Sequence, residues 1–206
     1  MSEQTSPETS EIRNPGSENA SSERGRLIDG KAFAAGLTQS TAEHVKDFYS
    51  RHHVTPGLAV VLVGNDPASE VYVRNKALQT HRAGMRSFMH MLPETTSEEE
   101  LLALIARLNV DPEIHGILVQ LPLPAQIDPR RVTNAIAADK DVDGLGESNT
   151  GRLALGTPGL VPCTPLGCLL LLKSELGYHL RGIHPVIVGA SNLVRKPMSQ
   201  RLRIAG

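Results

Sequence analysis

Residues 58–76 read LAVVLVGNDPASEVYVRNK, and this stretch decides the fold. Its first six residues are all apolar, which is typical of a parallel β-strand buried on both faces. The turn GNDP follows, and then a segment that favours a helix ending at Gly84, a residue type common at helix C-termini. On that helix Tyr72 and Lys76 are four residues apart and share one face. A helix that begins at the carboxyl end of a strand faces the crevice where α/β proteins bind ligands, so this pair predicts a site. The alternative is a solvated lysine that covers a half-buried tyrosine.

The apolar spacing around this stretch alternates between helical and strand periods. Further elements are predicted as a helix from Lys31 to about Pro56, a strand from Met85 to Leu92, a helix opened by the capping box Ser97-x-x-Glu100, a strand Gly116–Val119 and a helix opened by Asp128-Pro129. Strands that alternate with helices favour a parallel sheet with covering helices. The sequence therefore predicts an α/β fold.

Two short polar segments follow the strand at 116–119. Gln120 comes directly after it, and the prolines at 122 and 124 end the strand there, so Gln120 is predicted on the same rim of the sheet as the start of the Tyr72–Lys76 helix. The tetrad Asp141-Val142-Asp143-Gly144 brackets a valine with two carboxylates. Such a tetrad is either a turn or part of a cation site, and no further cation ligands accompany it.

The last 43 residues begin another unit. Thr164-Pro165 starts a predicted helix that ends at Gly177, and Pro185–Val188 is a predicted strand that leads into the turn Gly189-Ala190-Ser191 and a further helix. One strand, turn and helix cannot close a nucleotide-binding sheet. We therefore expect a disordered tail (1–25), a catalytic domain (26–163), and a linker helix with an incomplete Rossmann-like domain (164–206).

Composition excludes several functional classes. The 21 basic and 22 acidic residues give a net charge of −1, and aromatic residues are only 3%, so neither nucleic acid nor a lipid surface is an expected partner. No apolar run is long enough to span a bilayer. The eight histidines lack metal-binding spacing, and no metal is expected. Cys163 and Cys168 are interpreted as reduced thiols of a cytoplasmic protein, because no secretory signal precedes them.

Five strings occur in an order that is more specific than any one of them: VGNDPASEVYVRNK, HGILVQLPLP, KDVDG, NTGRLALG and PCTPLGC. With them the chain resembles the bifunctional methylenetetrahydrofolate dehydrogenase/methenyltetrahydrofolate cyclohydrolase family, from about Arg26 to Gln200. The resemblance implies one-carbon metabolism with tetrahydrofolate substrates, and a contribution to purine biosynthesis. It also implies the following site: Lys76 as the catalytic residue of the cyclohydrolase, Gln120 as its hydrogen-bond partner, Tyr72 stacked on the folate, Asp143 bound to the pterin, and Val119 and Leu121 lining the cleft.

The same resemblance implies NADP as cofactor, bound at Gly189, Ala190 and Ser191, and a homodimer. Here the chain departs from the family pattern. Ala190 stands where the family has an arginine that contacts phosphate, and Arg195 stands where it has a turn glycine. Leu78 replaces a second helix lysine that is common in the family. These departures predict impaired NADP binding.

Three functional hypotheses remain open from the sequence. The chain is an active cyclohydrolase with little or no dehydrogenase activity, or a piece of a fully bifunctional enzyme, or a non-catalytic remnant that binds folate or a partner. The intact set Tyr72, Lys76, Gln120 and Asp143 favours the first two.

Overall fold

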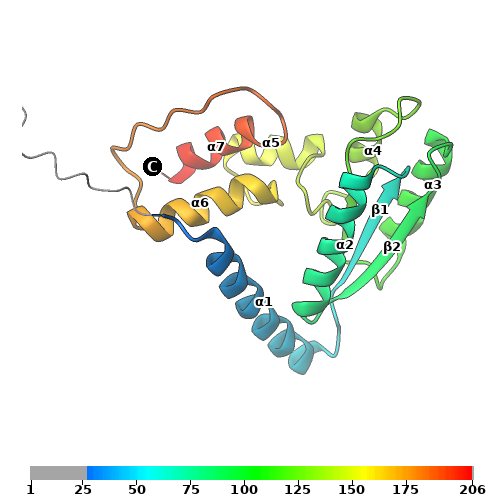
Figure 1. The fold of residues 1–206 in the computed structure, drawn as a ribbon, viewed down its shortest axis with the longest axis horizontal. Coiled ribbons are helices and arrows are strands. Elements are labelled where there is room, and N and C mark those ends of the chain that lie inside the picture. The colour runs from blue at the N-terminus through cyan, green and yellow to red at the C-terminus, as the bar shows by residue number, and fades with distance from the viewer. Residues whose placement is uncertain (1–26, 206) are drawn as a thin grey trace, which may run out of the picture.

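The computed structural model describes residues 27–205, so the predicted tail at 1–25 lies outside the described residues. In chain order the elements are α1 (Gly30–His52), β1 (Gly57–Val63), α2 (Pro67–Arg82), β2 (Arg86–Leu92), α3 (Glu98–Val110), β3 (Gly116–Val119), α4 (Pro129–Ala135), α5 (Glu147–Leu155), α6 (Cys163–Leu176) and α7 (Arg195–Ala205). The three strands form one parallel sheet in the order β2-β1-β3, and helices cover both of its faces (Figure 1). The predicted α/β fold with a parallel sheet is confirmed.

Local sequence signals place the ends of the helices around the sheet. Asp66 accepts a hydrogen bond from the Ser69 backbone N–H at 2.8 Å and caps α2, with Pro67 at its first position. The capping box of α3 is complete: Glu100 N–H donates to Ser97 Oγ at 3.2 Å, and Ser97 N–H donates to Glu100 Oε2 at 2.8 Å. Both helices therefore begin where the sequence predicts.

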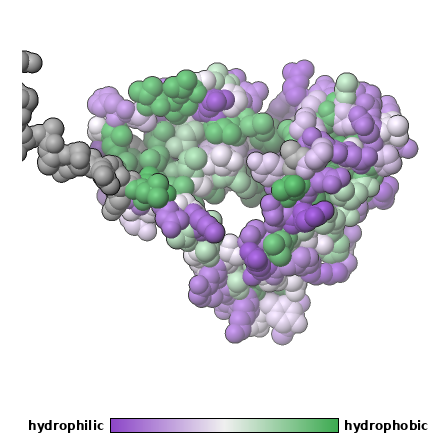
Figure 2. All heavy atoms as spheres, viewed as in Figure 1, coloured by the Kyte–Doolittle hydropathy of each residue, from purple (hydrophilic) through white to green (hydrophobic). Residues whose placement is uncertain are grey.

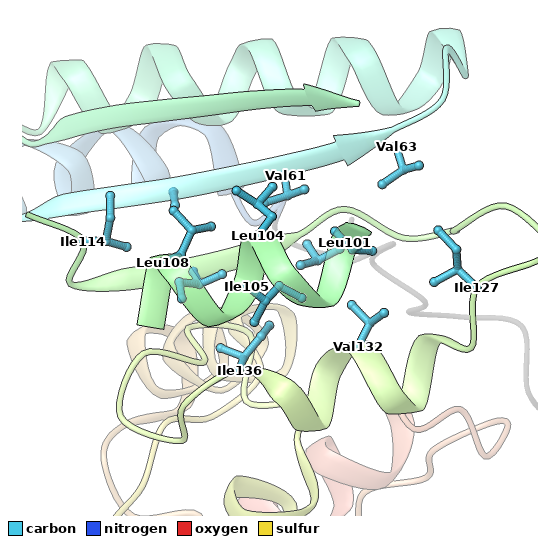
Figure 3. Close-up of a cluster of buried hydrophobic side chains, with 13 residues drawn as sticks. Val61, Val63, Leu101, Leu104, Ile105, Leu108, Ile114, Ile127, Val132 and Ile136 are labelled. Atoms are coloured by element: carbon cyan, nitrogen blue, oxygen red, sulfur yellow. The ribbon is translucent and has the colours of Figure 1, made fainter. Parts of the chain in front are cut away.

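The core lies on both sides of β1. On one face, alternate residues of β1 and β3 pack against the apolar stripes of α3 and α4, and Figure 3 shows these side chains meeting between the sheet and the helices: Val61, Val63, Leu101, Leu104, Ile105, Leu108, Ile114, Ile127, Val132 and Ile136. On the other face a smaller cluster joins Val60, Leu62 and Leu118 to Val73 of α2. Because β1 is buried on both faces, its sequence is apolar without alternation.

Helix α1 is long but none of its residues is buried. Its predicted apolar stripe is only half-covered: Phe33 and Val45 are partly buried, and Leu37 keeps 49% of its surface exposed. The helix contacts α2 near the sheet and runs away from it towards α6 (Figure 1). It therefore forms a wall beside the sheet rather than part of its core.

Helices α5, α6 and α7 form a second group beside the sheet, in which α7 packs on α5 and α6. The predicted helix at 164–177 is confirmed as α6. The strand predicted at Pro185–Val188 is wrong: the structure shows no strand there, and Val186 and Val188 are 89% and 83% exposed. A β-strand needs a neighbouring strand to accept its hydrogen bonds, and the described residues supply none beside this segment. Figure 2 shows apolar side chains gathered on this upper part of the molecule.

Within residues 27–205, no helix combines the length and apolarity needed to cross a membrane.

Candidate active site

A pocket of about 790 Å³ lies between α1, α2 and the sheet. Figure 2 shows the molecule hollowed between α1 and α2. The volume falls in the range that holds a drug-sized ligand. Tyr72 and Lys76 both line the pocket, so the helical spacing predicts their shared face correctly. The residues that line it are Leu37, Thr38, Thr41, Pro56, Gly57, Leu58, Tyr72, Asn75, Lys76, Gln79, Thr80, Ala83, Met85, His115, Gly116, Leu118, Val142, Asp143, Cys163 and Thr164.

The pocket extends further along the sheet than the sequence predicts. The prediction placed it at the carboxyl rim of the sheet, but its walls include Gly57 and Leu58 at the amino end of β1 and Gly116 at the amino end of β3. The reason is the position of Lys76 within α2. The helix runs back along the sheet from its start at Pro67, so a side chain ten residues into it lies over the middle of the sheet.

Lys76 is held by Gln120, the residue directly after the carboxyl end of β3. Its Nζ donates a hydrogen bond to Gln120 Oε1 at 3.2 Å, across 44 residues of sequence. Gln120 Nε2 in turn donates to the Leu121 backbone carbonyl at 2.7 Å, which fixes the amide so that its oxygen faces the lysine. The amine is half-buried, and its partner accepts without neutralising its charge. The contact between Lys76 and Gln120 that the family resemblance implies is present.

Asp143 also lines the pocket, in the turn that follows Asp141. Burial raises the pKa of its carboxyl; the Lys76 cation acts in the opposite direction, and the Asp141 charge adds to the increase. No ion pair joins Lys76 to Asp143 in the part of the chain that the structure describes. Both groups therefore line the same pocket and interact electrostatically without a direct ion pair.

Cys163 is a pocket residue that sequence reasoning missed, although it lies in the quoted string PCTPLGC. It opens α6, and its thiol donates a hydrogen bond to the Val142 carbonyl at 3.5 Å. The residue as a whole is exposed to solvent, but its thiol rests against the pocket wall. Burial there raises the pKa of the thiol, the Asp143 carboxylate raises it further, and Lys76 lowers it. The thiol is therefore a neutral hydrogen-bond donor at neutral pH and not an activated nucleophile.

Three predicted residues do not line the pocket: Gln120, which reaches Lys76 from beside it, and also Val119 and Leu121. The side chain of Val119 belongs to the core beneath α3 and does not line this pocket, and its role in lining the cleft stays a prediction. Leu121 is half-buried and contributes through its carbonyl, which orients Gln120. His115 is a second pocket residue that the sequence did not reveal; its Nδ1 accepts a hydrogen bond from the Gly57 N–H at 3.1 Å.

The predicted cofactor turn is remote from this pocket. Gly189 has φ of +106°, a conformation that suits glycine, and Ser191 Oγ accepts from the Arg195 backbone N–H at 3.4 Å near the start of α7. The Arg195 side chain lies directly against Gly189, where a Cβ would come within 2.5 Å of it. With the preceding segment exposed and unpaired, the described residues do not form the sheet and turn that hold a dinucleotide.

A larger hollow, of about 1120 Å³, lies over α6, α7 and the segment before α7. Its walls are mainly leucine, isoleucine and valine, with few groups that carry chemistry. We therefore place the candidate active site in the smaller pocket, whose walls carry an amine, a phenol and a carboxylate, and where the Gln120 amide holds the amine. Among residues 27–205, no cluster of three or more histidine, cysteine or acidic side chains is arranged to hold a metal ion.

The fold and the pocket define an α/β protein with a lysine-centred site between a parallel sheet and two helices. Comparison with known proteins identifies its family. The profile described as tetrahydrofolate dehydrogenase/cyclohydrolase, catalytic domain, matches residues 28–143. The chain belongs to this family.

Curated relatives match over most of the chain but not over most of their own length. The bifunctional protein FolD of Gluconacetobacter diazotrophicus is 78% identical over 181 residues, which cover 88% of this chain and 58% of the relative. That of Gluconobacter oxydans is 66% identical over 181 residues, with 88% and 59% covered. The chain therefore spans a little under three fifths of the curated relatives that it matches.

Solved structures of the same family share the fold of this chain. The bifunctional enzyme FolD of Campylobacter jejuni superposes with a TM-score of 0.84 at 44% identity, over 88% of this chain and 64% of that one. The methylenetetrahydrofolate dehydrogenase-cyclohydrolase of Trypanosoma brucei, solved with NADP and an inhibitor, gives 0.83 at 31% identity, over 87% and 61%.

Proposed function

We propose that this chain binds a tetrahydrofolate in the 790 Å³ pocket and hydrolyses 5,10-methenyltetrahydrofolate to 10-formyltetrahydrofolate. The observation that carries the proposal is the Lys76–Gln120 hydrogen bond, which holds an amine over a pocket that also contains Tyr72 and Asp143. Membership of the family supports the choice of substrate.

The reaction needs a proton carrier. Water adds to the cationic methenyl carbon and loses a proton, which leaves a carbinol; the bond from this carbon to N5 then breaks as the hydroxyl loses its proton and becomes the formyl carbonyl, and N5 receives a proton. We assign the transfer to Lys76, whose amine accepts the proton of water and whose ammonium returns one to nitrogen. Gln120 holds the amine in one place throughout, so that little reorientation is needed between the two steps.

Tyr72 and Asp143 are assigned to binding. Tyr72 is 63% exposed on the pocket wall, which leaves its ring free to stack on the flat part of the folate. Asp143 offers two carboxylate oxygens to the adjacent ring N–H and amino donors of the pterin. Its buried position makes the carboxylate a stronger partner for those donors than it would be in water.

The test is hydrolysis by the chain itself. Purified protein should accelerate the loss of the methenyl absorbance above the buffer rate, with saturation by substrate. Isothermal calorimetry should show folate binding in the same concentration range. Binding without turnover would favour a folate-binding module over an enzyme, and the absence of both would refute the proposal.

The family also implies NADP-dependent oxidation of 5,10-methylenetetrahydrofolate, and the Trypanosoma brucei structure contains NADP. The residues described here do not fit this cofactor. Gly189, Ser191 and α7 offer one turn and one helix start, and Arg195 covers the glycine. A single phosphate subsite falls short of the roughly 8 kcal/mol that micromolar binding requires. We propose that residues 1–206 alone neither bind NADP usefully nor reduce it, and saturable micromolar binding in calorimetry would contradict this.

A further inference from the structure

Asp141, the first carboxylate of the 141–144 tetrad, does not face the pocket. Only 2% of its surface is exposed. Its carboxylate accepts three hydrogen bonds: from the Gly146 N–H at 2.9 Å, the Leu145 N–H at 3.3 Å and the Asn149 side-chain amide at 3.1 Å. A buried carboxylate is tolerated only when such donors surround it, so these bonds fix Asp141 in place.

The backbone around Asp141 joins this group to the sheet. The Lys140 carbonyl accepts from the Ile117 N–H of β3 at 2.7 Å, and the Gly144 N–H donates to the Asp141 carbonyl at 3.0 Å. Asn149, on α5, is 1% exposed and also donates to the Ala138 carbonyl at 2.8 Å. The turn from 141 to 146 is therefore held by hydrogen bonds within itself, and further hydrogen bonds join it to β3 and to α5.

Asp143 depends on this turn for its position. Across residues 27–205, no hydrogen bond to its own carboxylate is present, so its position depends mainly on the backbone of the turn. Gly144 has φ of +60°, and a Cβ there would lie 2.8 Å from the Leu160 carbonyl oxygen. The turn thus has little freedom to present Asp143 in another way.

We propose that Asp141, held by Asn149, is a positioning residue that sets where the Asp143 carboxylate stands in the pocket and how strongly it binds the folate. This inference rests on the proposed function for its ligand, but the geometry that carries it belongs to the protein alone. Asp141 touches no part of the pocket and takes no part in proton transfer.

The electrostatics of the pocket provide a readout that a purely structural role would not affect. The pKa of Asp143 is raised by burial first, and the Asp141 charge also contributes to the increase. The titratable groups that line the pocket with Asp143 or interact with it come from several elements: Lys76 and Tyr72 on α2, His115 before β3, Cys163 on α6 and Asp141 on the same turn. Of these groups, Asp141 does not line the pocket, so a substitution there changes the charge near Asp143 without removing a pocket residue.

The first experiment follows Asp143 directly and needs no ligand. Carboxyl carbons are observed by NMR during a pH titration, and the signal of Asp143 is identified by its loss in Asp143→Asn. Asp141→Asn should lower the pKa of Asp143, because it removes a neighbouring negative charge. Asp139→Asn, an exposed carboxylate two residues away, is the matched control and should leave it unchanged. An unchanged pKa in Asp141→Asn would overturn the inference.

The second experiment is a double-mutant cycle on folate affinity, measured by calorimetry with 5,10-methenyltetrahydrofolate. Asp141→Asn should weaken binding about tenfold or more, because it displaces a binding group from its aligned position. If Asp141 acts through Asp143, the double variant with Asp143→Asn should bind no worse than Asp143→Asn alone. Losses that simply add would overturn the inference.

A second variant guards against misfolding. If Asp141→Asn does not fold, Asn149→Ala keeps the Asp141 charge and both backbone donors to its carboxylate, and it enters the affinity measurement with the same direction expected. A wild-type chain that binds no folate would refute the proposed function, and the NMR titration would then decide the positioning role by itself.

Discussion

Gly116→Ala is expected to disturb the pocket through the turn that carries Asp143. Gly116 is buried at the start of β3, and a Cβ built there lies 2.5 Å from Val142 Cγ1. Ordinary contacts begin at 3.4 Å, so Val142 must retreat by about 1 Å. Overpacking of this kind costs about 1–3 kcal/mol. Asp143 follows Val142 directly, and a displacement of about 1 Å can lower turnover by about 100-fold.

Urea denaturation and methenyltetrahydrofolate hydrolysis measure the two effects. Val142→Ala in the Gly116→Ala background removes the clashing methyl and should recover most of the turnover. Gly167→Ala is the control, because a Cβ there meets nothing within 4 Å and alanine favours the helix. If Gly116→Ala is as stable and as active as wild type, or if Val142→Ala brings no recovery, the proposed packing of the turn is wrong.

Three further changes test separate parts of the account. Ser97→Ala removes the α3 cap and should cost about 1 kcal/mol in urea denaturation with turnover unaffected, whereas a full wild-type midpoint would show that the cap contributes nothing. Asp143→Asn should stabilise the fold at neutral pH. The buried carboxylate has a folded-state pKa above its ordinary 3.8, so its ionisation penalises wild type in full above the folded pKa and not at all below 3.8. The gain should therefore vanish in acid, and an equal gain at both pH values would contradict the cause. Gln120→Leu removes the acceptor for Lys76 and should lower kcat about tenfold with little change in folate affinity; an unchanged kcat would refute the role of the hydrogen bond.

The parts of the fold that the sequence predicted are those set by local signals. The cap of α3 depends on Ser97 and Glu100, which are three residues apart, and the burial of β1 follows from its own apolar run. The strand predicted at 185–188 failed because a strand is completed by a partner elsewhere in the chain, and propensity alone cannot supply one.

The candidate site also has a part that could be predicted from the sequence and a part that could not. The shared face of Tyr72 and Lys76 follows from helical geometry, and the contact with Gln120 follows from the family resemblance. The sequence could not predict which face of the sheet Val119 lies on. A strand that is apolar throughout does not reveal which of its alternate residues faces which layer of helices. Cys163 and His115 reach the pocket from segments far apart in the sequence, and no local pattern marks them.

Lys76→Met is the sharpest test of whether Lys76 carries the proton in hydrolysis. Methionine keeps an unbranched apolar stem but has no group that can accept or donate a proton, so the protein should fold and still bind folate. Hydrolysis of 5,10-methenyltetrahydrofolate should fall by about 100-fold or more, the usual contribution of a positioned proton carrier. Arg74→Met, an exposed cation two residues earlier on α2, is the matched control and should keep its activity. Equal turnover by Lys76→Met and wild type would show that Lys76 is not the proton carrier.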